Sequence, residues 1–255
     1  MFFHCFIFPF YNKFVKCLAY GPWGPIHQIS IFVFRKLYNI ASPTKKFATL
    51  GDFFLRLDPI QIAATSLVSP AEAAVIEGPQ SFTNDSITVK GLRYFWSQMP
   101  ELQNFNTTKA IFWNLYLAPH NYHWVHSPAA GSEVQVFWHR GRTWPVNAWG
   151  RRKSPALYAE NERFTYRFLT EEYGWVLLIC VGALAVSSFL AGDKNVTTEN
   201  FGAEKWLPFS SSIEKGQRLL GFKMGSSVLL VTEKAPGLNS FRKLGPMLKV
   251  GDALR

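Results

Sequence analysis

The stretch WVLLICVGALAVSSFLAG, residues Trp175–Gly192, decides between two folds for this chain. It carries no charged residue over its 18 positions, which is close to the length that an α-helix needs to cross a bilayer. Glycines and the serine pair at 187–188 interrupt it, and its flanks are acidic (Glu171, Glu172 and Asp193) rather than basic. The pattern therefore predicts one or two buried β-strands, with a membrane span as the alternative.

Further strand-length runs surround this stretch from about residue 66 onward, separated by Gly, Pro and Asn. These runs are Ile87–Val89, Ile111–Leu117, Val134–Trp138, Phe164–Phe168, Val176–Val186 and Val228–Val231. Many short strands with turn residues between them indicate a mostly antiparallel sheet. The fold class that we expect is α+β, in which a mainly antiparallel β domain follows short amphipathic helices near the N-terminus.

The first 60 residues are rich in Phe and in basic side chains. Segments 10–20 and 27–40 predict two short amphipathic helices, separated by the break at 21–25. Aromatic and basic side chains together favour a helix that lies in the interface of an anionic membrane. The alternative is that these helices cover the core and their charges are only solvated. We therefore divide the chain into a basic, membrane-facing helical region at 1–60 and a β-rich domain at 61–255.

Composition narrows the choice of partners. Lys and Arg number 27 against 17 Asp and Glu, so the formal charge of +10 favours an anionic partner, either nucleic acid or acidic lipid. No RNA-binding signature is present, so we expect no nucleic acid.

Cys5, Cys17 and Cys180 form no CxxC pair, which indicates a reducing, cytosol-facing setting. The apolar start, Met1–Phe10, has no basic region before it and no cleavage signal after it, so we expect no removable signal peptide.

Three of the six histidines, His120, His123 and His126, lie within the tract Tyr116–Pro128. Imidazoles this close together predict a metal site, acid–base chemistry, or only the polar residues of a strand and turn. No Asp or Glu lies nearby as a further ligand, and residues three apart face opposite sides of a strand, so the metal is the weakest interpretation. The other two remain open at this point.

A second cluster, Lys215–Val231, contains a Gly225–Ser226 step directly before an apolar run. Glycine allows the backbone to bend where other residues are strained, and a hydroxyl after such a bend can approach the preceding carbonyl. Taken alone, the pattern fits the entry to an ordinary β-hairpin equally well.

Together the two clusters resemble the phosphatidylserine decarboxylase family, over about Phe47 to Val250. Tyr116–Pro128 is similar to the family's tract Tyr-Leu-x-Pro-x-Asp-Tyr-His-Arg-x-His-x-Pro, and Phe222–Val228 is similar to its processing site, Lys-x-Gly-Ser-Thr/Ser-Val. Shorter matches occur in the family's order at Leu50–Arg56, Val68–Glu72, Lys90–Gly91 with Tyr94, and Asn161–Arg163. The histidine tract and the Gly-Ser site, about 100 residues apart, carry the resemblance.

The resemblance implies a proenzyme that cuts itself between Gly225 and Ser226. The Ser226 hydroxyl would attack the Gly225 carbonyl, and Ser226 would end as a covalent pyruvoyl group at the start of a small chain, residues 226–255. His126 matches the histidine that acts with an aspartate as the base, and Glu72 stands at the aspartate's position. The amine of phosphatidylserine would form a Schiff base with the pyruvoyl group and lose CO₂, giving phosphatidylethanolamine. His123, or alternatively His126, would return the proton.

The resemblance also implies partners and a location. These are phosphatidylserine and an anionic membrane surface, with the protein peripheral on the cytoplasmic face of the bacterial inner membrane. No metal is expected, and a homodimer is compatible with the sequence. The alternative function is a non-catalytic relative that binds acidic membranes, because the site departs from the family pattern and about 1 Å of misplacement can cost roughly 100-fold in rate. The departures are Glu72 for Asp, Ala73 for Gly, Leu92 for His, and His120-Asn121 with Trp124 in place of a charged Arg/Asp pattern.

Overall fold

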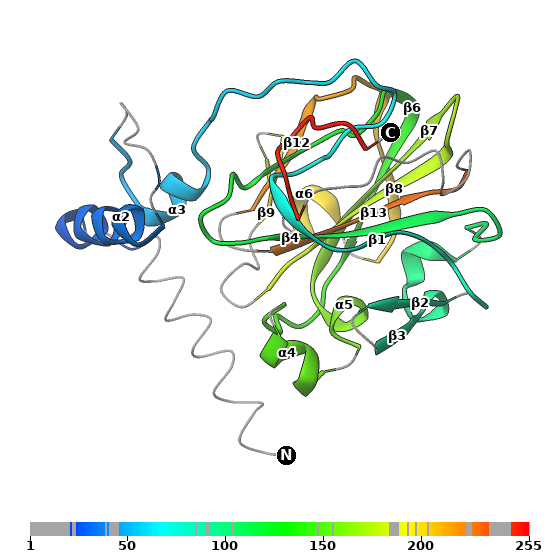
Figure 1. Ribbon diagram of the computed structural model, residues 1–255, viewed down its shortest axis with the longest axis horizontal. Coiled ribbons are helices and arrows are strands. Elements are labelled where there is room, and N and C mark those ends of the chain that lie inside the picture. Colours follow the sequence, from blue (N-terminus) through cyan, green and yellow to red (C-terminus); the bar gives the residue numbers. More distant parts are fainter. Residues whose placement is uncertain are drawn as a thin grey trace.

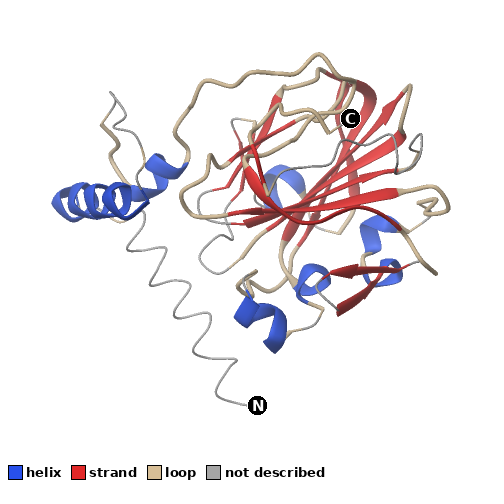
Figure 2. Cartoon of the chain, viewed as in Figure 1, coloured by secondary structure: helices blue, strands red, loops and turns tan. Residues whose placement is uncertain are grey.

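The computed structural model describes most of the chain after residue 45. The described residues are 21, 24–38, 40, 46–84, 86–89, 92–103, 105–146, 148–154, 156–183, 189–192, 194–196, 198–202, 204–222, 226–234 and 246–254. The helix predicted at 10–20 and the residue Gly225 lie outside them, as does the side chain of Ser226. The strands form the body of the molecule, and the helices α2 (Gly24–Tyr38) and α3 (Leu50–Phe54) stand to one side of it (Figures 1 and 2).

The largest sheet contains eight antiparallel strands in the order β11-β6-β7-β8-β13-β4-β1-β14. Their bounds are β1 Ala73–Ser81, β4 Ile111–Leu117, β6 Gly131–His139, β7 Arg163–Thr170, β8 Gly174–Val181, β11 Trp206–Ile213, β13 Ser226–Thr232 and β14 Met247–Leu248. Central strands such as β8 are almost entirely apolar because they are buried on both faces. The edge strand β11 is largely exposed and carries polar residues. The α+β prediction with mainly antiparallel strands is confirmed.

Smaller elements complete the β-rich part. A four-stranded sheet has the order β10-β9-β12-β5, with β5 Trp124–His126, β9 Phe189–Ala191, β10 Lys194–Asn195 and β12 Arg218–Phe222. A separate hairpin joins β2 Ser86–Val89 to β3 Leu92–Phe95. The short helices are α4 Ala148–Lys153, α5 Leu157–Glu160 and α6 Thr198–Phe201, with single 3₁₀ turns at Trp96–Gln98 and Pro100–Leu102.

The apolar stretch at 175–192 forms strands. Residues Val176–Val181 belong to β8 and are completely buried between β7 and β13, and β9 follows at Phe189–Ala191 in the smaller sheet. This confirms the prediction of buried strands, since full burial inside a sheet needs apolar side chains on both faces. Among the residues that the structure describes, no helix is long and apolar enough to cross a membrane.

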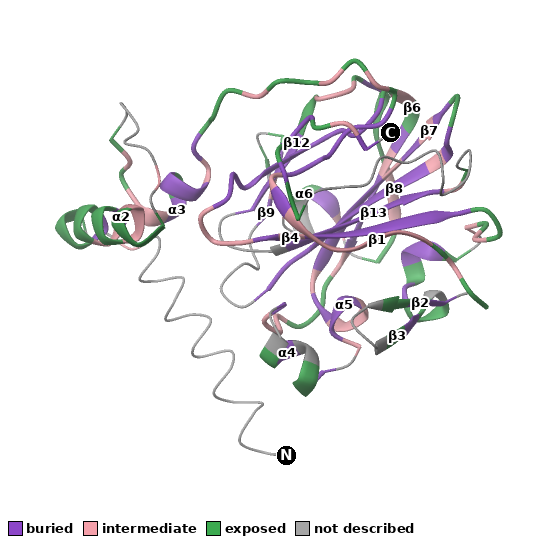
Figure 3. Cartoon of the chain, in the orientation of Figure 1, coloured by how far each residue is buried: buried purple, intermediate pink, exposed green. Residues whose placement is uncertain are grey.

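Among the described residues, two helices precede the β-rich part. Helix α2, Gly24–Tyr38, begins three residues before the helix predicted at 27–40 and buries only His27 and Ile31. Figure 3 shows that most of its surface is exposed. Helix α3, Leu50–Phe54, starts at a capping box that Thr49 forms with Asp52, and it buries two phenylalanines. Only α3 thus contributes substantially to the core, which leaves α2 with an uncovered apolar surface.

Candidate active site

The histidine tract contacts Phe222 and Ser226, the described residues before and after the predicted cut. At one end, Ser226 pairs with Leu117, the last residue of β4, within the large sheet. At the other end, the backbone N–H of Phe222 donates to the carbonyl of His123 at 2.9 Å. The tract from 117 to 123 therefore contacts the described residues on either side of the predicted cut. Two clusters that are about 100 residues apart in the sequence meet here because β4 and β5 pair with β13 and β12.

His123 is completely buried and has one free nitrogen. Its Nδ1–H donates to the carbonyl of Asn121 at 2.7 Å, so the lone pair lies on Nε2, which has no hydrogen-bond partner among the described residues. The Phe54 ring packs edge-on against the imidazole, with the centroids 4.9 Å apart. Burial lowers the pKa of His123 to about 3. The ring is therefore neutral at physiological pH and carries a buried proton acceptor.

His126 has both nitrogens engaged. Its Nδ1–H donates to the carbonyl of Gly216 at 2.7 Å, and its Nε2 accepts from the Tyr122 hydroxyl at 3.1 Å. Burial lowers the pKa of His126 and raises the pKa of Tyr122 to about 12, so the phenol keeps its proton and remains a donor. Gly216 has a φ of +80°, and a Cβ there would come within 2.9 Å of the Ile62 side chain. Glycine is therefore required where the backbone turns its carbonyl towards His126.

Glu72 is half-buried beside the same tract. Its Oε1 accepts from the side-chain amide of Asn121 at 2.8 Å. Two residues earlier, the carbonyl of Pro70 accepts the backbone N–H of His126 at 2.8 Å, which keeps this segment next to the histidine. No direct hydrogen bond joins Glu72 to His126 in the described part of the chain. The two partners that the resemblance pairs are instead bonded to the neighbouring residues Asn121 and Tyr122.

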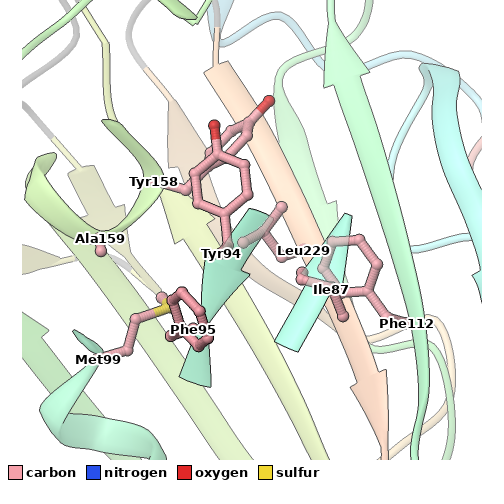
Figure 4. A pocket seen from close by; sticks show the side chains of 8 residues that line it. All are labelled: Ile87, Tyr94, Phe95, Met99, Phe112, Tyr158, Ala159 and Leu229. Carbon is pink, nitrogen blue, oxygen red and sulfur yellow. The ribbon is translucent and has the colours of Figure 1, made fainter. Parts of the chain in front are cut away.

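A polar pocket opens beside these groups. It has a volume of about 290 Å³ and is lined by Glu72 and Tyr122, by the segment Asp58–Gln61, and by Lys249, Val250 and Asp252. A second hollow, between the β2–β3 hairpin and the large sheet, is lined by Ile87, Tyr94, Phe112 and Leu229 among others (Figure 4). It measures about 10 Å³, which is the room of about one water molecule, and we regard it as a gap in packing.

The segment around helix α3 holds the tract in place. The guanidinium of Arg56 donates from Nη2 to the carbonyl of His120 at 2.9 Å and from Nε to Asp58 at 3.1 Å. The Trp124 indole donates to the carbonyl of Leu55 at 3.0 Å, and the Tyr38 ring stacks on His120 with the centroids 5.2 Å apart. The family-like element Leu50–Arg56 thus acts as a support for the histidine tract.

The family-like element Asn161–Arg163 lies at the start of β7, where Arg163 pairs with Val181 of β8, which in turn pairs with Ser227 of β13. Arg163 is completely buried and makes a bidentate ion pair with Glu101, which is also completely buried. Asn161 donates to the carbonyls of Trp144 and Gly182. These contacts join loops to β7 and have a structural role. Lys90 and Gly91 lie outside the described residues.

Sequence reasoning named the histidines and Glu72 as candidates but did not name the residues that bond to them. Both Asn121 and Tyr122 lie inside the tract. Asn121 was noted only because it departs from the family pattern, and Tyr122 only because it matches that pattern. Arg56 was noted as a match without a role, and no sequence signal distinguished Gly216 from an ordinary loop glycine. Of the described residues, no three His, Cys, Asp or Glu side chains are grouped so that they could hold a metal ion.

Comparison with known proteins identifies the family of this chain. The family model described as phosphatidylserine decarboxylase matches residues 52–255. A phosphatidylserine decarboxylase proenzyme of Myxococcus xanthus is 29% identical over 226 residues, which cover 82% of this chain and 80% of that protein. Proenzymes with the same name from Coxiella burnetii and Brevibacillus brevis are 28% identical over 240 residues (88% of this chain, 85% of the relative) and 29% identical over 227 residues (82% and 80%). The chain belongs to the phosphatidylserine decarboxylase family.

Proposed function

We propose that this chain is a phosphatidylserine decarboxylase that cuts itself between Gly225 and Ser226. The observation that carries the proposal is the contact of the histidine tract with both Phe222 and Ser226, the described residues on either side of the cut. The family match and the names of the relatives support the same reaction. The chain enters the reaction as a proenzyme and becomes a lyase by maturation.

In this proposal, self-cleavage uses Ser226 as the nucleophile. Its hydroxyl oxygen attacks the Gly225 carbonyl carbon and the peptide C–N bond breaks, so an ester joins the two parts and Ser226 has a free amine. Loss of the Cα proton of Ser226 then eliminates the Gly225 carboxylate, which cuts the chain and leaves a dehydroalanine. Its enamine tautomerises to an imine, and water releases ammonia to leave the pyruvoyl carbonyl. A serine hydroxyl is a weak nucleophile until a base takes its proton, and we assign that role to Nε2 of His126. The Tyr122 hydroxyl bonds to this nitrogen, so it has to turn away before the proton is transferred. The carboxylate of Glu72 stabilises the positive charge that His126 gains when it takes the proton.

The pyruvoyl group that would form from Ser226 fits the neighbourhood of β13. A buried acceptor without a partner, Nε2 of His123, lies in the tract that contacts this strand, and it offers a place for a proton of the bound reactants. When present, the group supplies an electrophilic carbonyl and an electron sink for decarboxylation. His123 is neutral at physiological pH, so it takes up a proton before it gives one. We assign to Nε2 the proton that the ammonium of phosphatidylserine loses and its later return to the substrate carbon.

The proposal includes peripheral association with an anionic membrane through α2. The exposed apolar and aromatic side chains of this helix are Ile26, Ile29, Phe32, Val33, Leu37 and Tyr38, and the basic residues Arg35 and Lys36 lie in its last turn. An exposed apolar face next to basic side chains is typical of helices that lie in the bilayer interface. Helices α2 and α3 lie beside each other (Figure 1). Tyr38, the last residue of α2, stacks on His120 of the tract, so a bilayer that takes up the exposed face of α2 comes close to the site.

The mass of the purified protein under denaturing conditions tests the cleavage. We expect two chains, residues 1–225 and a pyruvoyl-blocked 226–255, and release of CO₂ from phosphatidylserine. Ser226→Ala should remain a single chain of 29.0 kDa. Ser227→Ala is the matched control, because successive residues of a strand face opposite sides, and it should still give two chains. A wild-type chain that stays whole and releases no CO₂ would contradict the proposal.

A further inference from the structure

Two hydrogen bonds with opposite demands meet at Asn121. Its Oδ1 accepts the backbone N–H of Ala118 at 2.8 Å, and its Nδ2 donates to Oε1 of Glu72 at 2.8 Å. The side chain is 1% exposed, so water cannot replace either partner. A backbone N–H only donates and an ionised carboxylate only accepts, so the two partners together fix the orientation of the amide.

An asparagine is the side chain of this size that satisfies both partners. An aspartate would accept from Ala118 but would set a second carboxylate at hydrogen-bond distance from that of Glu72, and like charges this close disfavour ionisation of both. An alanine would leave the buried N–H of Ala118 without its acceptor. The family pattern has an acid at both positions, whereas this chain has a longer acid at 72 and an amide at 121.

We propose that Asn121 is the positioning residue of Glu72 and that the two departures from the family pattern form a matched pair. Glutamate has one methylene and one rotatable bond more than aspartate, so its carboxylate has more freedom to lose. The bond from the fixed amide of Asn121 removes that freedom by holding Oε1. The carboxylate is thereby kept beside Tyr122, which lines the same 290 Å³ pocket and donates to His126. The catalytic part of this inference rests on the proposed function.

The pairing itself can be tested without cleavage, in a Ser226→Ala background. We expect Asn121→Asp to lower the Tm by about 5 °C at pH 7. The loss should shrink towards pH 4, where one of the two carboxylates binds a proton. Asn106→Asp is the matched control: Oδ1 of Asn106 also accepts a backbone N–H, from Thr108 at 3.0 Å, but the side chain is exposed and no carboxylate of a described residue bonds to it. Equal losses in the two variants, or a loss that does not depend on pH, would overturn the pairing.

The positioning role is tested in the chain that retains Ser226. We expect Asn121→Asp to slow self-cleavage at least about tenfold at pH 7, since misplacement by a fraction of an ångström has that effect. The reciprocal exchange Glu72→Gln with Asn121→Asp restores one acid and one amide, so it should recover the Tm but not the cleavage rate. A cleavage rate that recovers together with the Tm would overturn the positioning role. If the wild-type chain does not cleave, the proposed function fails, and the Tm series still decides the pairing.

Discussion

At the scale of single residues, His123 differs most from a histidine in water. Burial lowers its pKa to about 3, nearby Arg56 and His120 lower it further, and the hydrogen bond to the carbonyl of Asn121 opposes the shift only partly. An unfolded chain takes up this proton near pH 6.5. Between about pH 6.5 and pH 3 the unfolded state therefore binds more protons than the folded state, so stability contributed by His123 is present above pH 6.5 and is lost as the pH falls.

This sign gives a prediction for the free energy of unfolding. In the Ser226→Ala background, we expect His123→Gln to flatten the dependence on pH between pH 6 and pH 4 by up to about 1.4 kcal/mol per pH unit, the slope of one proton. Urea unfolding at a series of pH values measures it. His126, whose pKa burial also lowers, remains in both proteins and contributes equally to both slopes. Identical slopes would mean that His123 is not held neutral by the fold.

The partners of the two histidines mark the limit of prediction from sequence at this scale. Spacing and resemblance identified His123 and His126 because a family motif preserves residue types. The acceptor of His126, the carbonyl of Gly216, belongs to the backbone of a segment 90 residues away, and a sequence does not reveal which way a carbonyl points. The sequence showed Tyr122 only as a residue that matches the family motif, since its hydrogen bond to Nε2 of His126 depends on how the turn before β5 folds.

At the scale of elements, α2 is the helix whose surface the fold leaves uncovered. Leu37 is 74% exposed, and it lies in the last turn of the helix close to the basic residues Arg35 and Lys36. We expect Leu37→Glu to weaken binding to vesicles that contain phosphatidylserine by about tenfold or more, because it removes the transfer of one leucine and adds a charge that anionic lipid repels. Vesicle co-sedimentation at low salt measures the change.

The control for this helix is a matched substitution elsewhere. Met247→Glu replaces an apolar side chain that is 48% exposed on β14, at the edge of the large sheet. It adds the same charge to the molecule, so it should bind vesicles almost as the wild type does. Equal weakening by both variants would show that overall charge, and not the face of α2, determines binding.

Strands with strong local patterns were predictable, and strands made by distant partners were not. The run Ile111–Leu117 coincides with β4, because six apolar or aromatic residues out of seven suit a buried strand. By contrast, β10 and β14 contain two residues each, and each owes its assignment to a partner strand, β9 and β1 respectively. So short a segment has no periodicity to read, and its strand character exists only after the sheet has formed.

At the scale of the whole molecule, the predicted cut falls between two sheets. Strand β12, before it, pairs with β5 and β9 in the four-stranded sheet, and β13, after it, lies between β8 and β4 in the eight-stranded sheet. Breaking the chain between residues 225 and 226 therefore interrupts neither sheet. A proenzyme with this topology can mature without unfolding, and the new chain end stays where β13 begins.

The same topology predicts that the two chains remain together after cleavage. Val228–Val231 of the small chain are almost completely buried, at about 1.5–3 kcal/mol for each side chain, and β13 pairs with a strand on both sides. The far end is held as well, since β14 pairs with β1 and the backbone N–H of Leu254 donates to the carbonyl of Leu67 at 3.1 Å. We expect the matured protein to elute as one species in native size-exclusion chromatography and to separate into two chains only in denaturant. Elution of residues 226–255 as a free peptide under native conditions would contradict this, because it would mean that a central strand of the large sheet can leave without unfolding the rest.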